Sequence, residues 1–158
     1  MAYRNILKIG DSTLNKISKE AKIDERLFSL LDDLKDTLEK ADGLGLAAPQ
    51  VGILRRVAII TDENDEIIEL INPVIVKASG CVLDAEGCLS VPGRYGEVER
   101  PQNVTVGTYN RDGSYKEIDL ADMIARAACH EIDHLDGKLF VDKVTRFLTD
   151  EEIKKSRD

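Results

Sequence analysis

Long apolar runs and export signals are both missing from this sequence. A membrane-spanning helix needs about 18 consecutive apolar residues, and no stretch approaches that length. The first residues, Met-Ala-Tyr-Arg-Asn, include none of the apolar core that a signal peptide carries. We therefore expect a cytoplasmic protein without a membrane partner.

Cysteine is also scarce, with three residues at positions 81, 88 and 129. An odd number of cysteines without an export signal argues against a disulfide framework and for reduced thiols, one of which could bind a metal. The formal net charge of −8 argues against nucleic acid as a specific partner, because binding phosphates requires a basic surface. A locally basic surface could still contact ribosomal RNA.

The 158 residues contain no internal repeat, low-complexity tract or linker, so we expect a single domain over 1–158. Leucines at helical spacing predict a helix over 24–41, with Asp24 as its N-cap and Gly43 as its stop signal. A second helix is predicted from about 121 to 135. A third is expected from about residue 149, where Thr-Asp-Glu-Glu has the form of a capping box.

Between these helices the sequence has short segments rich in β-branched residues. Strands are predicted at 56–60, 66–71, 104–109 and 114–120, and the last two should form a hairpin. The segment 43–50, Gly-Leu-Gly-Leu-Ala-Ala-Pro-Gln, is too apolar for a surface loop and too rich in glycine for a regular element. The pattern as a whole is typical of an α+β fold with mostly antiparallel strands.

The chain has only two histidines, and both lie in the segment His-Glu-Ile-Asp-His at 130–134. On a helix, residues four apart project from the same face, so His130 and His134 can bind one divalent ion. Glu131, roughly 100° around the axis, can lie beside the metal without binding it. This arrangement supplies two ligands and a general base, which is the chemistry of the H-E-x-x-H pattern.

Two histidines leave a third protein ligand to be found. A protease of the zincin type would use a downstream carboxylate, for which Glu151 and Glu152 are the candidates. The other candidate is Cys88, in a segment Glu-Gly-Cys-Leu-Ser that we expect to form a loop near Pro92-Gly93. Cys81 and Cys88 could instead complete a closed structural zinc site, although their spacing is long for one and leaves Glu131 without a role.

The segments Gly-Leu-Gly-Leu-Ala-Ala-Pro-Gln, Glu-Gly-Cys-Leu-Ser and His-Glu-Ile-Asp-His together resemble the three signature motifs of the peptide deformylase family, in the family's order. The resemblance extends from Ile6 to about Phe147. It implies mainly antiparallel sheets around a central helix that carries the H-E-x-x-H motif. It also implies a hydrolase that removes the N-formyl group from formyl-methionyl nascent peptides and releases formate.

The resemblance further implies a role for individual residues. Cys88, His130 and His134 would bind one divalent metal, iron(II) in cells, with zinc, nickel or cobalt in the purified protein. Glu131 would be the general acid and base, while Gln50 and the backbone N–H of Leu89 would stabilise the oxyanion. The residues expected to contact substrate are Leu44, Gly45 and Gly87 along its backbone, and Met123, Arg126 and Ala127 at its methionine pocket.

Two departures from the family pattern stand out. Cys129 occupies the position before His130 where many members have glutamine, and we expect it to have a packing role. The sequence ends soon after its last capping box, whereas some bacterial members have a longer C-terminal helix associated with ribosome docking. A ribosome contact is therefore an open expectation, and the competing interpretations are a zincin-type protease and a metal-stabilised binding module without activity.

Overall fold

The structure, a computed structural model, describes residues 2–156. Its helices are α1 (Glu25–Ala41), α2 (Asp122–Leu135) and α3 (Asp150–Ser156), with short 3-10 turns η1 (Ser12–Asn15), η2 (Ala48–Val51) and η3 (Phe140–Asp142). Its strands are β1 (Gly45–Ala47), β2 (Val57–Thr61), β3 (Ile67–Ile71), β4 (Val74–Ser79), β5 (Val82–Cys88), β6 (Val91–Arg100), β7 (Asn103–Tyr109), β8 (Tyr115–Ala121) and β9 (Arg146–Phe147).

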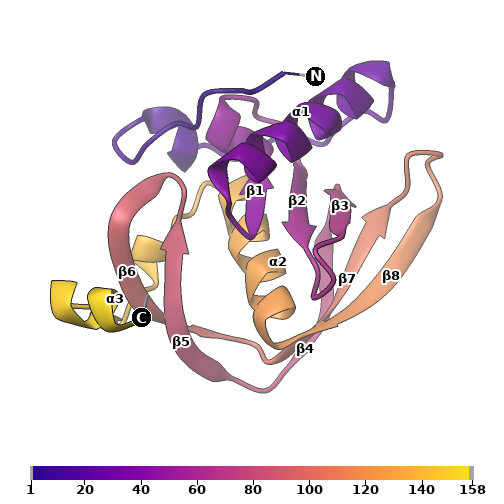
Figure 1. The fold of residues 1–158 in the computed structure, drawn as a ribbon. Coiled ribbons are helices and arrows are strands. Elements are labelled where there is room, and N and C mark those ends of the chain that lie inside the picture. Colours follow the sequence, from indigo (N-terminus) through magenta and orange to yellow (C-terminus); the bar gives the residue numbers. More distant parts are fainter. Residues whose placement is uncertain (1, 157–158) are drawn as a thin grey trace.

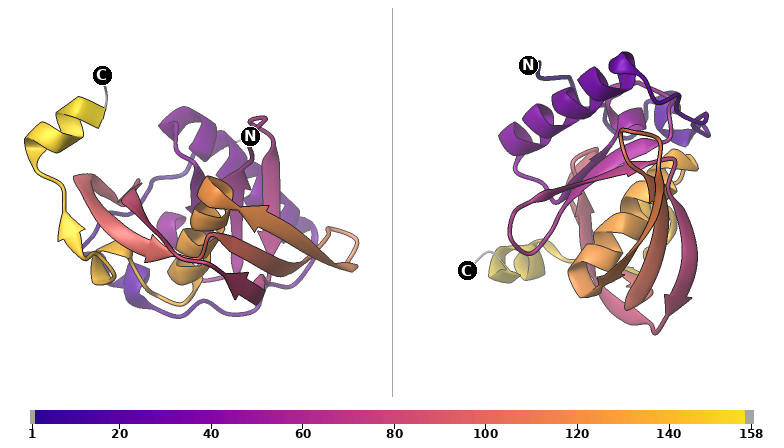
Figure 2. Two further views of the ribbon diagram at one scale, coloured as in Figure 1. Left: turned by 90° about the horizontal axis from the view of Figure 1, so that it is seen from below. Right: turned by 90° about the vertical axis from the view of Figure 1, so that its right-hand side faces the viewer.

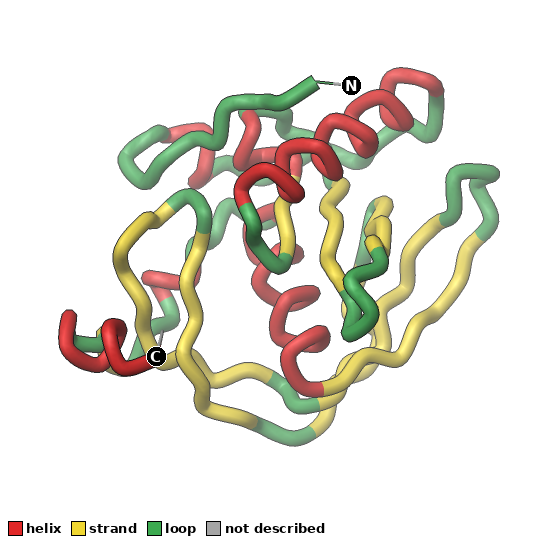
Figure 3. Tube along the Cα trace, in the orientation of Figure 1, coloured by secondary structure: helices red, strands yellow, loops and turns green. Residues whose placement is uncertain are grey.

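The described strands form three sheets of three, ordered β1-β2-β3, β4-β7-β8 and β5-β6-β9, and every pairing within them is antiparallel. The strands surround α2, which occupies the centre of the molecule (Figure 1; Figure 3). The predicted α+β fold, with mainly antiparallel sheets around a central helix, is therefore confirmed.

Strand β2 lies between the two long helices and is buried on both faces. Ala58 and Ile60 belong to the apolar core around α2, whereas Val57 and Ile59 belong to the core beneath α1. Because side chains alternate along a strand, this single strand joins the two cores. It also fixes the neighbouring β1, which pairs with β2 and leads directly into η2.

Helix α1 begins as the sequence predicted, because the side chain of Asp24 accepts a hydrogen bond from the backbone N–H of Leu27 at 3.0 Å. Its end differs. Asp42, with a left-handed φ of 58°, caps the helix in place of Gly43. The segment that follows is also more regular than its glycine content suggested, because it forms β1 and η2.

The β5–β6 hairpin was not recognised in the sequence. Cys88 is the last residue of β5 and Pro92 and Gly93 belong to β6, so the expected ligand-bearing loop is wrong. Polar residues dominate this hairpin, because one face is exposed and the other covers charged side chains that are described below. Apolar alternation, the usual sequence signal of a strand, is therefore weak here.

Helix α3 lies at the periphery, beyond the edge of β6 that pairs with β9 (Figure 2). Its capping box is formed by reciprocal bonds: the Thr149 N–H donates to the carboxylate of Glu152 at 3.0 Å, and the Glu152 N–H donates to Thr149 Oγ1 at 3.2 Å. Within the described residues, no helix has both the length and the apolar character that crossing a membrane requires.

Candidate active site

Three side chains that could hold a metal ion converge where the end of β5 meets the last turns of α2. The sulfur of Cys88 lies 3.4 Å from Nε2 of His134, and the two histidine Nε2 atoms are 3.3 Å apart. All three donor atoms lie within 4.8 Å of one another. The helix places both imidazoles on one face, and the strand brings the thiol to that face from a segment more than 40 residues earlier.

These separations fit a tetrahedral metal site. Metal–sulfur bonds of about 2.3 Å and metal–nitrogen bonds of about 2.0–2.1 Å require edges of roughly 3.5 Å between sulfur and nitrogen and roughly 3.3 Å between nitrogens. The distances of 3.4 Å and 3.3 Å match both edges. The donor set of one thiol and two imidazoles therefore fits a single divalent ion and leaves one position for water or substrate.

A buried carboxylate that sequence reasoning missed orients one of the imidazoles. Glu86 Oε1 lies 2.8 Å from His130 Nδ1, so Nδ1–H donates to the carboxylate and the Nε2 lone pair faces the metal position. Glu86 is two residues before Cys88 on β5, which places both side chains on the same face of the strand. Strand alternation would have identified it, had the strand been recognised.

Two arginines neutralise Glu86. Arg100 binds its two oxygens at 2.7 and 3.0 Å, and Arg126 binds Oε2 at 2.7 Å. Burial alone would raise the pKa of Glu86, but hydrogen bonds from His130 and Arg100 outweigh it and lower the pKa to about 2. Arg100 also binds Asp133 of α2 at 2.6 Å, so the network ties the hairpin to the helix.

The two histidines have opposite electrostatic environments. Burial lowers the pKa of His134 well below its usual value, which keeps the imidazole neutral and able to bind a metal. Burial also disfavours the charged form of His130, but Glu131, Cys88 and Glu86 together raise its pKa to about 10. The negative groups that favour the protonated form of His130 would also stabilise a divalent cation bound beside it.

Glu131 is buried beside Cys88, His130 and His134 and is not part of their cluster. Its Oε1 has no hydrogen-bond partner among the described residues, as is also true of His134 Nδ1. Burial, the main cause, raises the pKa of Glu131 to about 7. A Cβ added to Gly45 would lie 2.7 Å from Glu131 Oε2, so the glycine leaves the space that the carboxylate occupies.

Gln50 approaches the thiol from η2. Its Oε1 accepts the backbone N–H of Ala47 at 2.9 Å, which fixes the amide plane. Its Nε2 consequently faces Cys88 Sγ at 3.6 Å and Ser90 Oγ at 3.1 Å. A hydrogen-bond donor is thereby held next to the metal-binding residues.

A cavity of about 500 Å³ opens onto these groups. All six expected substrate-contacting residues line it: Leu44, Gly45, Gly87, Met123, Arg126 and Ala127, together with Gln50, Cys88, Leu89, His130 and Glu131. The cavity wall also includes Tyr95, which sequence reasoning missed. The Tyr95 ring packs against Gly87, where any Cβ would clash with it, and the guanidinium of Arg126 turns away to Glu86 and backbone carbonyls.

The structure does not support the alternative ligands. Cys81 is exposed and outside the ligand cluster, which argues against a closed structural zinc site. Glu151 and Glu152 lie on the peripheral helix α3, and Glu152 is paired with Arg146 at 2.7 Å. Cys129 is buried in the apolar core, where burial raises the pKa of its thiol.

Comparison with known proteins identifies relatives along almost the whole chain. A model of the polypeptide deformylase family matches residues 3–149. The peptide deformylase of Caldicellulosiruptor bescii is 53% identical over 158 residues, covering 99% of this chain and 95% of that protein.

Solved structures of peptide deformylases have a similar fold. A peptide deformylase from Legionella pneumophila has a TM-score of 0.86 at 42% identity, covering 99% of this chain and 92% of its own. The Met-Ala-Ser-bound class I type b peptide deformylase from Acinetobacter baumannii has a TM-score of 0.85 at 32% identity, covering 90% and 99% of the two chains. This chain therefore belongs to the peptide deformylase family.

Proposed function

We propose that Cys88, His130 and His134 hold the divalent metal of a deformylase active site, and that Glu131, Gln50 and Leu89 carry the chemistry around it. The reaction follows from family membership: the enzyme removes the N-formyl group from nascent peptides. The distances from His134 Nε2 to Cys88 Sγ and to His130 Nε2, which match two edges of a tetrahedral site, are the observation that carries the assignment of the ligands.

When bound, the metal supplies Lewis acidity that activates water and polarises the formyl carbonyl. Two imidazoles and a thiolate suit iron(II), zinc, nickel and cobalt. We propose iron(II) as the metal in cells, with the others as replacements in the purified protein. Glu86 contributes by holding His130 in the tautomer whose Nε2 is free to bind.

Glu131 is the proposed general base and acid. Its carboxylate lines the cavity beside the ligands, and its Oε1 is committed to no other described group. It can therefore take the proton of the attacking water and return it to the leaving amine. Burial raises the pKa of Glu131 to about 7, which suits a group that must both accept and donate a proton near neutral pH.

Gln50 and the backbone N–H of Leu89 are the proposed oxyanion stabilisers. Because Ala47 fixes the amide of Gln50, its Nε2 is oriented before the substrate arrives. Preorganised donors of this kind lower the barrier, since they need no reorientation as charge develops on the formyl oxygen.

The substrate is proposed to bind along β1. Among the described strands it pairs only with β2 and is therefore an edge of its sheet, so the backbone of Gly45 can pair with an extended peptide, flanked by Leu44, whose carbonyl accepts from the Thr61 N–H at 2.9 Å. Met123 and Ala127 of α2 would then contact the methionine side chain, and Arg126 would border the pocket with its aliphatic stem. The Acinetobacter relative, with Met-Ala-Ser bound, is consistent with such a ligand.

A cytoplasmic location and a ribosome contact belong to the same proposal, because formylated chains are made on the ribosome. The test of the function is hydrolysis of a formyl-Met peptide by metal-loaded protein, with the acetyl-Met analogue as control. We expect formate release from the first only. Cleavage of internal peptide bonds would indicate a protease, and binding without turnover would indicate an inactive binding module.

A further inference from the structure

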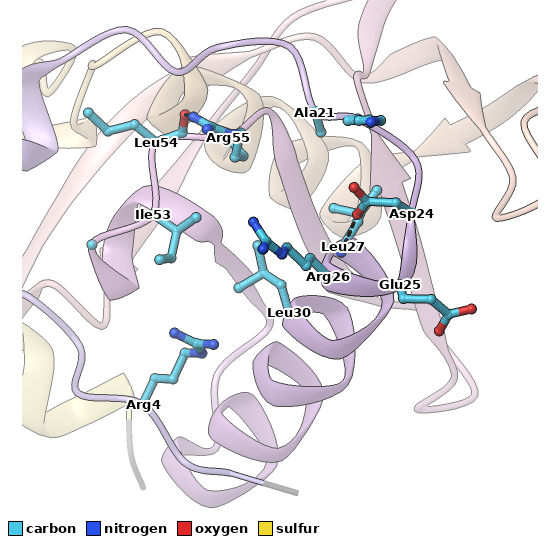
Figure 4. A pocket seen from close by; sticks show the side chains of 12 residues that line it. Arg4, Ala21, Asp24, Glu25, Arg26, Leu27, Leu30, Ile53, Leu54 and Arg55 are labelled. Carbon is cyan, nitrogen blue, oxygen red and sulfur yellow. Dashed lines mark hydrogen bonds between the residues drawn. The ribbon is translucent and has the colours of Figure 1, made fainter.

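A second cavity, of about 840 Å³, lies between the start of α1 and the segment that follows η2 (Figure 4). Its lining shares no residue with the active-site cavity. Cavities that bind small molecules typically measure about 300–1,000 Å³, so the size is that of a ligand site. The proposed deformylase chemistry gives this cavity no role.

Apolar side chains form its floor. Leu27 and Leu30 of α1 are buried, while Ile53 and Leu54 on the opposite side are partly exposed. In Figure 4, Leu30 and Ile53 face the same space from the two sides. Burying the exposed parts of such side chains against a ligand is favourable, at about 25 cal/mol for each Å² of apolar surface removed from water.

Cations surround this floor in a protein whose net charge is −8. Arg4, Lys22, Arg26 and Arg55 line the cavity, against two carboxylates, Asp24 and Glu25. In Figure 4 the Arg26 and Arg4 guanidinium groups lie next to Ile53 and Leu30, whereas Glu25 extends away from them.

These cations differ in whether another side chain or a carbonyl group already binds them. Arg4 is paired with Asp33 at 2.9 Å, and the side chain of Asp24 is used to cap α1. Among the described residues, no hydrogen bond or ion pair engages the side chain of Lys22 or Arg26. Within the described part of the chain, the side chain of Arg55 donates only to the neighbouring carbonyl of Leu54, at 3.0 Å. Donors and positive charge are thus available to an anionic ligand.

We propose that this cavity binds a small organic anion with an apolar body, as a medium-chain carboxylate has, with Arg26 and Arg55 binding the head group. The apolar floor can bind the apolar body of such a molecule, and the charged rim can bind its head group. An acidic protein segment fits less well, because a cavity of ligand size is much smaller than a protein–protein interface.

Octanoate is the probe, and the zinc-loaded enzyme is the sample, followed by two-dimensional NMR of backbone amides. We expect saturable shifts of amides within 21–30 and 52–55, and no comparable shifts near Cys88 or His130. Acetate has the charge without the apolar body, and 1-octanol has the body without the charge. Each should bind at least about tenfold more weakly than octanoate, which corresponds to about 1.4 kcal/mol.

The double variant Arg26→Gln/Arg55→Gln should weaken octanoate binding by about tenfold and leave 1-octanol unaffected. Lys155→Gln, which removes an exposed cation from α3, is the matched control and should change neither. Both variants should keep the deformylase activity of the parent enzyme, which shows that they are folded.

Four results would overturn the proposal. Octanoate shifts centred on the active-site cavity would place the ligand there. Binding that is equal for octanoate and acetate, or unchanged in the double variant, would show that the rim and floor do not act together. Displacement of octanoate by hexaglutamate at similar concentration would assign the surface to an acidic peptide. None of these results depends on the roles proposed for the catalytic residues.

Discussion

The carboxylate of Glu86 and the imidazole of His130 are joined at 2.8 Å through Nδ1. Both side chains are buried, and the carboxylate is also held by Arg100 and Arg126. His130, the proposed metal ligand, is therefore positioned by a charged network that crosses from β5 to α2. A network of this kind is costly to break, because each member left alone is a buried, unpaired charge.

Replacing Glu86 by glutamine tests that network. Glu86→Gln should weaken metal affinity by about 10- to 100-fold, because a neutral amide, which can also turn its NH₂ group toward Nδ1, fixes the His130 tautomer less firmly than the carboxylate does. It should also lower the free energy of unfolding by about 3–5 kcal/mol, since buried Arg126 loses its carboxylate partner and Arg100 is left with Asp133 alone. Metal competition with a chelator and thermal melting measure the two effects. Glu99→Gln, an exposed position on β6, is the control, and equal metal affinity in both variants would contradict the positioning role.

The ligand assignment predicts a difference among the three cysteines. Cys88→Ser should bind far less metal and lose nearly all activity, because a hydroxyl is a poor ligand in place of a thiolate. Cys81→Ser and Cys129→Ser should keep their metal, and the second should be less stable because it places a hydroxyl in the core. Metal analysis of the three purified variants decides the matter. Loss of metal from Cys81→Ser would instead support the structural-zinc interpretation.

Acid stability should depend on Glu69. Burial alone would raise its pKa, but hydrogen bonds from Arg111 and Lys35 lower it below the ordinary value of 4.5. As pH falls through about 4.5 the unfolded chain takes up the proton first. The stabilisation is thus complete above that pH and is lost as pH falls through the folded pKa.

Urea unfolding of Glu69→Gln between pH 7 and pH 3 measures this contribution. The variant should be less stable than the parent at pH 7, and the difference should shrink below about pH 4.5. Glu66→Gln, at an exposed position without an ion pair among the described residues, should show no such trend. A difference that stays constant with pH would exclude the ionic origin.

Sequence patterns predicted the helices well, because amphipathic spacing and capping residues are local signals. Asp24 and the leucines of α1 could be identified without any knowledge of the fold. Glu86 and Tyr95 could not, since both lie on a hairpin whose alternation is masked by polar residues. Their partners His130 and Gly87 were identified, but the contacts arise from tertiary structure. Local periodicity does not show which strand face meets a given helix.

The proposed metal predicts sensitivity to air. An iron(II)–thiolate site with an open position exposes both the metal and the sulfur of Cys88 to oxidation. Protein prepared without oxygen should lose activity in air faster with iron(II) than with nickel bound. Activity followed over time in the two preparations is the measurement. Equal lifetimes would count against iron(II) as the working metal.

The role of Glu131 gives the most direct test of the mechanism. Glu131→Gln should keep the metal and the fold, because glutamine has the same shape and Glu131 is not among the ligands. The amide cannot take the proton from water or return it to the amine. Since general acid–base catalysis is worth about 10²–10⁴-fold, turnover on a formyl-Met peptide should fall by about 10³-fold or more.

Metal stoichiometry and melting temperature, measured on the same sample, separate catalysis from structure. Glu63→Gln, an exposed carboxylate on the β2–β3 turn, is the control and should match the parent in all three measurements. A Glu131→Gln enzyme that binds metal and keeps roughly a third of its turnover would remove Glu131 from the mechanism, because even a modest catalytic base is worth more. Loss of metal from this variant would instead make Glu131 a structural residue. Its Oε1, which has no hydrogen-bond partner among the described residues, would then be needed to hold the ligands in place.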